Sequence, residues 1–191
     1  MFCFINILFT TYVSQIQSTL PLYLTNFTNS DQFSITNLSG LFSLHIAFAA
    51  LFQLPVVKIL NRLTHLNGLM LSALIWGFTF ALVWLTGNVN NNAFYWGLLA
   101  VLAGAIALTT YNPAASAFVV DISPDSLRGI YFAINSQCWA IGYLIGPPLG
   151  GWVLDRGEIY AHNFWLILAL SVAIALSTLQ YLKQLMREKR K

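Results

Sequence analysis

The sequence has 191 residues, of which nine are Lys or Arg and six are Asp or Glu, so that charged residues make up 8% of the chain and the formal net charge is +3. Soluble globular domains carry about 25% charged residues, and this low value together with 58% hydrophobic residues excludes an ordinary soluble domain. Nucleic-acid binding is also excluded, because the basic residues stand at the ends of apolar segments rather than in one patch.

Long uncharged stretches predict helices that cross a membrane. Residues 1–30, 32–57, 63–120, 129–154 and 159–182 contain no Asp, Glu, Lys or Arg. Each stretch can supply the ~20 apolar residues that one transmembrane helix needs. The polar residues 87–92 divide the third stretch into two spans. Strands of a membrane barrel would alternate in polarity, and these runs do not, so the predicted fold is an all-α, polytopic membrane protein embedded in the lipid bilayer.

Six transmembrane helices are predicted in one domain over residues 1–182, followed by a basic tail over residues 183–191. Their ranges are 2–24, 36–59, 67–86, 93–118, 129–153 and 163–182. An even number of spans puts both termini on one side, and only Arg156 of the nine basic residues then faces the other side. Lys and Arg gather on the cytoplasmic side of membrane proteins. The pattern therefore predicts a multi-pass protein of the cell (inner or plasma) membrane with both termini in the cytoplasm. The basic residues on the cytoplasmic side are Lys58, Arg62, Arg128, Lys183, Arg187, Lys189, Arg190 and Lys191.

The first span carries polar side chains along one side. Residues three and four apart are neighbours on a helix, so Asn6, Thr10, Ser14 and Gln17 form a continuous stripe. A polar stripe inside a membrane needs protein or water beside it, which leaves two interpretations: hydrogen bonds between helices, or a cavity that holds substrate. The predicted candidates for a substrate cavity are Asn6, Thr10, Ser14, Gln15, Gln17, Tyr111, Asn112 and Gln137.

His45 lies near the middle of the second span. Histidine gains or loses a proton near neutral pH, and an ionisable group inside a membrane is a functional hypothesis. His45 is therefore the candidate for proton coupling, and its alternative is a neutral histidine held by a hydrogen bond.

In the fourth span, Pro113 lacks a backbone donor, which predicts a bend and a free carbonyl group near Thr109, with Asn112 beside it.

The fifth span combines regularly spaced glycines with a pair of prolines. Gly142, Gly146 and Gly150 repeat every four residues, which predicts a flat face for close helix packing. Proline kinks a helix, so this segment is interpreted as a hinge or a seal between bundles, with simple packing as the alternative. The motif consists of Gly142, Gly146, Pro147, Pro148, Gly150 and Gly151.

The loop before the fifth span is predicted to be cytoplasmic, and its candidate residues are Asp121, Pro124, Arg128 and Gly129. Ser123 is expected to cap a helix whose first turn holds Pro124 and Asp125. Asp121 and Arg128 are expected either to pair with each other or to bond a neighbouring loop. An exposed ion pair contributes only ~0 to 1 kcal/mol, so a structural role is favoured over a conformational switch.

Residues 113–151 resemble the major facilitator superfamily. The similarity is carried by Pro113, Asp121, Pro124 and Arg128-Gly129, and the segment 142–151 is similar to the antiporter motif of that superfamily. The resemblance implies one six-helix half of a transporter bundle, with a second six-helix half as partner and efflux as its direction. The residue four before Gly104 is Ala100, where an N-terminal half usually has Arg, and this difference favours the C-terminal half.

The predicted function is therefore half of a secondary active transporter that moves a small solute or drug, its small-molecule substrate, by alternating access. The alternative is a non-transporting membrane remnant or a scaffold subunit. An enzyme is not expected, because His45, His65 and His162 lie in different helices or loops and Cys3 and Cys138 show no metal-type spacing. Neither a metal nor a cofactor is predicted. Sequence encoded directly upstream would distinguish a half transporter from a remnant by containing six further spans.

Overall fold

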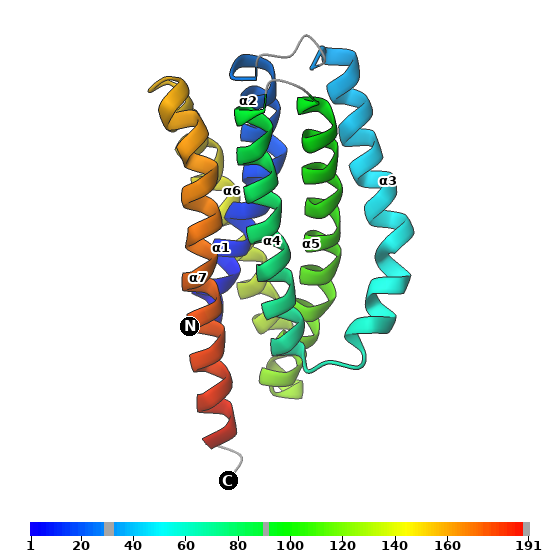
Figure 1. Cartoon of the computed structure of the whole chain (residues 1–191). Helices are drawn as coiled ribbons and strands as arrows, with labels where there is room; N and C mark the ends of the chain where they lie inside the picture. Colours follow the sequence, from blue (N-terminus) through cyan, green and yellow to red (C-terminus); the bar gives the residue numbers. More distant parts are fainter. Residues whose placement is uncertain (29–32, 90–91, 189–191) are drawn as a thin grey trace.

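The computed structural model describes residues 1–28, 33–89 and 92–188, and these residues form a bundle of α-helices without a β-strand (Figure 1). The all-helical fold class is confirmed. The Lys189, Arg190 and Lys191 of the predicted tail lie outside the described residues. The elements in chain order are α1 (Phe2–Ser14), the π-helix η1 (Gln15–Thr19), α2 (Leu20–Asn26), α3 (Ile35–Leu60), α4 (His65–Asn88), α5 (Ala93–Ile122), the 3₁₀-helix η2 (Asp125–Leu127), α6 (Arg128–Leu154) and α7 (Glu158–Glu188).

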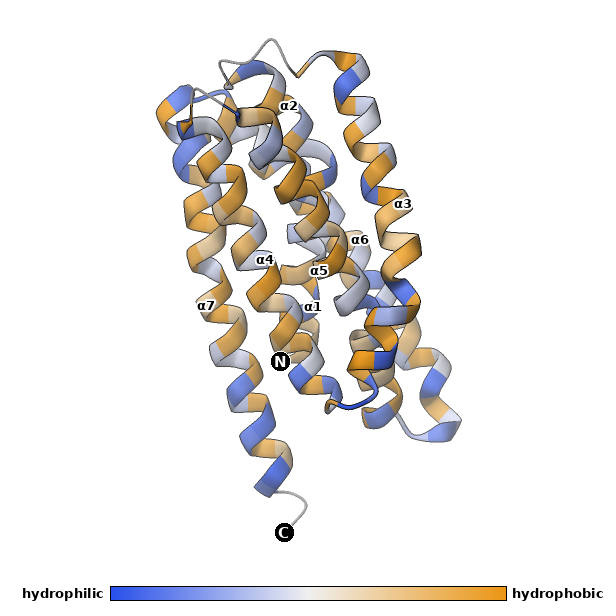
Figure 2. Ribbon diagram, turned by 45° about the vertical axis from the view of Figure 1, so that its right-hand side comes forward, coloured by the Kyte–Doolittle hydropathy of each residue, from blue (hydrophilic) through white to orange (hydrophobic). Residues whose placement is uncertain are grey.

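Within the described residues, four helices are long and apolar enough to cross a membrane, namely α3, α4, α5 and α7. The π-helix divides the first helical stretch into shorter pieces, and α6 carries the glycines, prolines and amide side chains that lower its hydropathy. Apolar residues follow the length of the helices while polar residues collect toward the ends (Figure 2). The chain is therefore a multi-pass membrane protein, and its six-span count stays a prediction.

Short polar residues begin two of the long helices. The side chains of Ser34 and Thr64 accept hydrogen bonds from the backbone amides of Asn37 and Asn67, each at 3.3 Å, at the starts of α3 and α4. Such N-caps satisfy amides that have no partner inside the helix.

Pro113 lies inside α5, which continues as one α-helix to Ile122. The start of α1 and the end of α7 lie toward the same end of the bundle (Figure 1).

An aromatic cluster forms the centre of the bundle between α1, α4 and α7. The rings of Tyr12 and Phe80 are 5.1 Å apart, and those of Trp76 and Phe80 are 5.6 Å apart. Trp165 of α7 packs on the same Phe80 ring at 6.2 Å, and the Tyr12 hydroxyl group bonds Ser171 at 2.7 Å. Lipid tails are as apolar as these side chains, so close packing rather than exclusion from water stabilises the cluster.

Two helices lie at the edge of the bundle and bury little of their surface. In α3, all of whose residues are described, the buried side chains are those of Leu38, Leu41, His45 and Leu60. In α6, which is also described throughout, the buried residues are Cys138, Gly142, Gly146, Gly150 and Leu154. Helix α3 packs mainly on α5, and α6 packs mainly on α1. Most of the surface of both helices is therefore left for lipid or for another protein.

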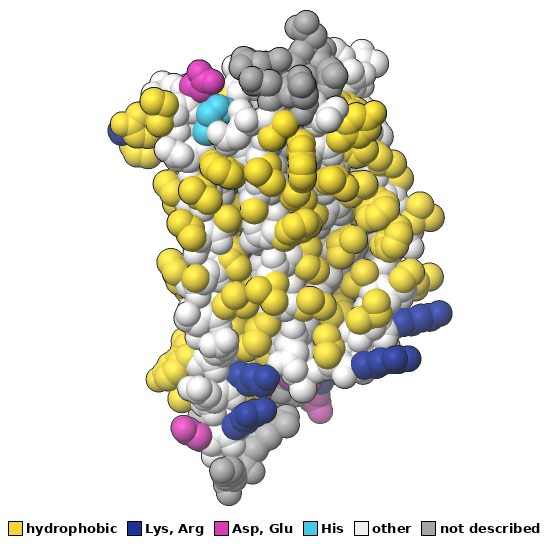
Figure 3. Space-filling view, in the orientation of Figure 1, with side chains coloured by type: hydrophobic (Ala, Val, Ile, Leu, Met, Phe, Trp, Pro, Cys, Tyr) yellow, Lys and Arg dark blue, Asp and Glu magenta, His cyan; other side chains and the backbone are white. Residues whose placement is uncertain are grey.

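The surface separates into an apolar middle and a basic end. Hydrophobic side chains cover the middle of the face shown in Figure 3, and most Lys and Arg side chains on that face gather near its lower end. Lys58, Arg62 and Arg187 are exposed, and Lys183 is half-buried. This distribution is typical of a protein whose middle lies in hydrocarbon and whose basic end lies at the membrane surface.

Leu69 and Leu74 of α4 offer a matched test of this packing, because Leu69 is fully buried whereas Leu74 is 56% exposed. We expect Leu69→Ala to lower the free energy of unfolding by about 2–5 kcal/mol, since it leaves a cavity in the core. Leu74→Ala should have little effect, because this side chain has few protein neighbours to lose. Thermal unfolding of both purified variants in one detergent measures the difference, and equal losses would contradict the described packing of α4.

Candidate functional site

The polar stripe of α1 packs against the glycine row of α6. The Thr10 hydroxyl group lies 3.1 Å from the carbonyl oxygen of Cys138, and the Ser14 hydroxyl group lies 3.4 Å from that of Gly142, while each also has a carbonyl acceptor in its own helix. One turn further along α6, Nε2 of Gln15 donates to the carbonyl oxygen of Gly146 at 2.7 Å. The two helices thus run side by side in register, and we call this contact the α1–α6 interface.

Each glycine of the row faces a hydroxyl-bearing residue on the first helical stretch. A Cβ atom on Gly142 would overlap Thr10 and lie 2.9 Å from its backbone carbonyl carbon. On Gly146 it would overlap the Ser14 hydroxyl group and lie 2.9 Å from Ser14 Cβ, and on Gly150 it would overlap Thr19. Non-bonded carbon atoms pack at about 3.5–4.0 Å. The helices can therefore approach this closely only because α6 has no side chains at these positions.

The ends of the interface are also held by polar side chains. Nδ2 of Asn6 donates to Oδ1 of Asn135 at 2.6 Å, and the Thr19 hydroxyl group donates to Oε1 of Gln15 at 2.5 Å. The second bond lies within the π-helix, which is followed two residues later by Pro21. π-Helical turns are rare and are frequent at functional sites. Here the π-helix carries both Gln15, which faces α6, and Gln17, which is exposed.

The predicted cavity residues fall into two groups. Asn6, Thr10, Ser14 and Gln15 are buried in the α1–α6 interface, where they make hydrogen bonds between helices. Tyr111 is buried as well, with its ring stacked on Phe9 at 4.8 Å. The exposed group consists of Gln17, Asn112 and Gln137. The structure therefore does not bring all eight predicted residues into one cavity.

A polar and aromatic surface continues from the interface on the side of α6 that faces α5. The Tyr143 hydroxyl group donates to Oε1 of Gln17 at 2.7 Å, and both residues are exposed. The ring of Trp139 stacks on Tyr143 at 6.0 Å and lies 6.1 Å from the ring of Tyr111. We call Gln17, Trp139 and Tyr143 the aromatic–amide face, and the buried ring of Tyr111 lies behind Trp139.

Gln137 does not belong to this face. Successive residues of an α-helix are about 100° apart around its axis, so Gln137 points nearly opposite to Trp139. Gln137 shares its side of α6 with Leu144, which is 74% exposed. Asn112 follows Tyr111 on α5 and is exposed. The amide groups of Gln137 and Asn112 make no hydrogen bond to the part of the chain that the structure describes.

His45 is buried between α3 and α5, where its Nδ1 lies 2.8 Å from the carbonyl oxygen of Val101. A carbonyl oxygen only accepts, so Nδ1 carries the proton and donates. This contact satisfies a neutral imidazole ring and leaves Nε2 without a partner among the described residues. Both interpretations of His45, proton coupling and a hydrogen-bonded structural role, are compatible with the geometry.

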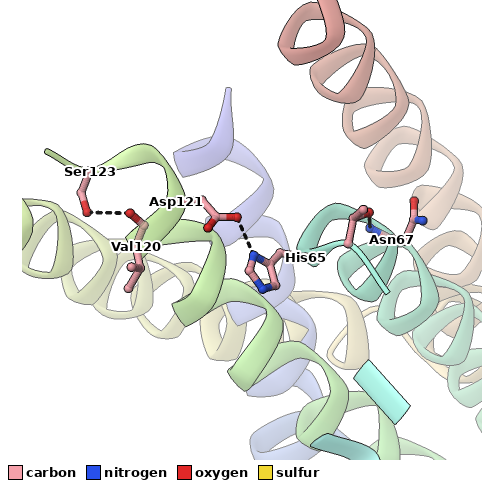
Figure 4. A network of polar contacts seen from close by, with 6 residues as sticks. His65, Asn67, Val120, Asp121 and Ser123 are labelled. Carbon is pink, nitrogen blue, oxygen red and sulfur yellow. Dashed lines mark hydrogen bonds and ion pairs between the residues drawn. The ribbon is translucent and has the colours of Figure 1, made fainter. Parts of the chain in front are cut away.

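The loops at the basic end hold two separate pairs of polar side chains, of which Figure 4 shows the one between His65 and Asp121. Nδ1 of His65, the first residue of α4, lies 2.5 Å from Oδ2 of Asp121 near the end of α5. Arg128 instead pairs with Asp125 three residues before it, also at 2.5 Å. Of the two expected arrangements, Asp121 thus adopts the contact with a neighbouring loop. Pro124 and Gly129 are exposed beside these pairs.

Ser123 differs from its predicted role as a helix cap. Its hydroxyl group donates to the carbonyl oxygen of Val120 at 3.2 Å, so it closes the C-terminal end of α5. Pro124 then precedes the short helix η2, in which Asp125 stands in the first turn. The Val120 carbonyl group also accepts from the backbone amide of Ser123 at 3.3 Å, so backbone and side chain of Ser123 meet the same end of α5.

Sequence reasoning missed Asn135, Trp139 and Tyr143 of α6 and His65 of α4. Trp139 and Tyr143 stand four residues apart beside the glycine row, a spacing that could have placed them on one side of the helix. No group of three or more His, Cys, Asp or Glu residues able to hold a metal occurs among the described residues. The site is thus built from amides, hydroxyl groups and aromatic rings.

The fold and the site together define a helical protein that spans a membrane several times, with polar and aromatic side chains on a surface at the level of its spans. The family model of the Major Facilitator Superfamily matches residues 2–190. The chain therefore belongs to this superfamily, whose members are membrane transporters rather than enzymes. No curated protein matches the chain.

Two glycines of α6 provide a test of the α1–α6 interface. Gly146→Leu should lower the free energy of unfolding by at least ~1 to 3 kcal/mol, the usual cost of overpacking, because Ser14 occupies the space that the new side chain needs. Gly151→Leu is the matched control, since a Cβ atom there would meet nothing within 4 Å. Size-exclusion chromatography and thermal unfolding in detergent compare the two variants.

A Gly146→Leu protein that folds and unfolds like the wild type would show that α6 does not lie against α1. Equal damage in both variants would show that leucine disturbs α6 itself rather than the interface.

Proposed function

We propose that this chain is the C-terminal six-helix half of a secondary active transporter, which moves a small solute or drug at a contact with a second six-helix half. The observation that carries the proposal is the exposed hydrogen-bonded pair of Gln17 and Tyr143 on the first helical stretch and α6. Polar side chains within a membrane face a bundle interior or a water-filled cavity rather than lipid. A second bundle placed over this surface would enclose such a cavity.

The large exposed surfaces of α3 and α6 support a second half as partner. Neither helix has a second long neighbour packed along it within the described part of the chain. Transporter folds commonly consist of repeated bundles with the substrate site between them. In this arrangement α3 and α6 flank the aromatic–amide face and contact the other half. The six spans then place both termini in the cytoplasm, with eight of nine basic residues on that side.

Assignment to the C-terminal half relies on the fourth and second spans. Ala100 occupies the position where an N-terminal half would be expected to carry Arg, and it is buried against its neighbours. The segment from Lys58 to Gly68 is a degenerate form of the loop motif expected of an N-terminal half. The export direction is proposed from the Gly142–Gly151 segment, which is similar to an antiporter motif.

Alternating access requires parts that move as units. The α1–α6 interface joins the first helical stretch to α6 through five polar contacts between helices and three glycine contacts. We propose that these helices move together and that motion occurs against the second half. His45 is the proposed proton-coupling residue, because its Nε2 remains available for a proton while Nδ1 is held by Val101.

A non-transporting remnant or scaffold subunit is the second candidate. The observation in its favour is that most of the polar stripe, namely Asn6, Thr10, Ser14 and Gln15, finds hydrogen-bond partners within this chain. A protein without a substrate pathway would then have lipid around the aromatic–amide face.

Cysteine labelling distinguishes the two candidates. The variant chain has Cys3 and Cys138 replaced by Ser, carries Gln17→Cys and is expressed from its own gene. Its one cysteine should react with a membrane-impermeant maleimide, because Gln17 borders the proposed aqueous pathway. Leu144→Cys is the matched control, since Leu144 is exposed at 74% on the opposite side of α6 and should face lipid. We expect at least a tenfold difference in labelling rate, measured by mass shift.

An unreactive Gln17→Cys would contradict a substrate pathway at this face and favour the scaffold. Equal reactivity of both cysteines would also contradict the proposal, because water would then reach the side of α6 that is assigned to lipid.

A further inference from the structure

A groove of about 320 Å³ opens at the basic end of the bundle, between the ends of α4, α5 and α7. Its apolar wall includes Leu66, Phe118 and Met186, and its polar rim includes His65, Lys183 and Arg187. These helix ends adjoin the apolar middle of the surface. The groove thus combines a hydrocarbon-like wall with cationic side chains at the height of the membrane surface.

Lys183 is fixed at the groove by a neighbouring helix. Its Nζ donates to Oδ1 of Asn67 at 2.7 Å, which ties α7 to the first turn of α4. An ammonium group has three donor hydrogens, so two remain for another acceptor. Lys183 is half-buried, and its position therefore depends on packing as well as on this bond.

Arg187 stands one helical turn beyond Lys183 on α7 and lines the same groove. Its guanidinium group has no ion pair with any described residue. Two cations four residues apart on a helix repel each other mildly when no anion lies between them. Both side chains line the groove, and neither has a carboxylate partner among the described residues. Donor hydrogens of both cations therefore remain for an acceptor from outside the chain.

The one acidic residue among the lining residues of the groove, Asp121, already has a partner. Asp121 is engaged by His65, whose Nδ1 donates to Oδ2 at 2.5 Å (Figure 4). This contact occupies one oxygen of the carboxylate group, and the two cations of the groove outnumber its single carboxylate. The groove therefore carries a net positive charge, with an apolar wall beside it.

We propose that this groove binds the headgroup phosphate of an anionic phospholipid. Arg187 and Lys183 contact the phosphate oxygens, and Phe118, Leu66 and Met186 contact the glycerol and the first methylene groups. Basic pockets between transmembrane helices are suited to lipid headgroups, and the guanidinium fork matches phosphate geometry. The bound lipid would join the ends of α4, α5 and α7. This proposal is independent of whether the chain transports a solute.

Native mass spectrometry of the full chain in non-ionic detergent tests the proposal with phosphatidylglycerol and phosphatidylcholine as probes. The wild type should retain one phosphatidylglycerol molecule in preference to phosphatidylcholine. Arg187→Gln should weaken that retention about fivefold, the effect of removing one basic residue at a lipid surface. Lys58→Gln is the matched control, because Lys58 is exposed on α3 at the same end but does not line the groove.

Arg187→Lys, which keeps the charge and loses the fork, should fall between the wild type and Arg187→Gln. Equal loss in Lys58→Gln and Arg187→Gln would overturn the proposal, since it would indicate general attraction to a basic surface. Equal retention of the two lipids by the wild type would also overturn it. Inorganic phosphate that displaces the lipid at equal concentration would overturn the assignment to a lipid, because the apolar wall would then contribute nothing.

Discussion

The close approach of α1 and α6 is the constraint on which the rest of the structure depends. Gly142, Gly146 and Gly150 leave room for hydroxyl-bearing residues of the first helical stretch, and carbonyl groups of α6 contact the side chains of Thr10, Ser14 and Gln15. In a membrane, apolar side chains gain little by leaving lipid for protein. Small residues and hydrogen bonds between helices therefore decide which helices pair. Helix α6 has few other contacts within the described residues, so this interface holds it in the bundle.

The same interface determines what the protein exposes. With its glycines turned toward α1, α6 places Trp139 beside Tyr111 of α5 and Tyr143 beside Trp139, and Gln17 of the π-helix bonds Tyr143. At the opposite edge, α3 is held to α5 by a few buried residues that include His45. The bundle thus has a well-packed centre of α1, α4, α5 and α7 and two edge helices with broad free surfaces. This division suits a transporter half that contacts a second bundle.

The sequence predicted the fold class because membrane helices require long uncharged runs, which are visible in one dimension. It also indicated both sides of the α1–α6 interface separately, as a polar stripe and as a glycine row. Their pairing could not be predicted, since Ser14 and Gly142 are 128 residues apart and spacing says nothing about which faces meet. The π-helix over Gln15–Thr19 could not be predicted either, because the residue pattern of the first span fits an α-helix of regular period. The sequence left two possible partners for Asp121, namely Arg128 and a neighbouring loop. In the folded chain the partner is His65.

A double-mutant cycle between Ser14 and Gly146 measures the central contact most directly. Gly146→Ala should destabilise the protein because the new methyl group meets Ser14, and Ser14→Gly should remove the obstacle. The account predicts that Ser14→Gly restores stability to the Gly146→Ala protein, with a coupling free energy of about 1 kcal/mol or more from unfolding in detergent. Strictly additive effects would contradict it, because residues that do not touch show no coupling.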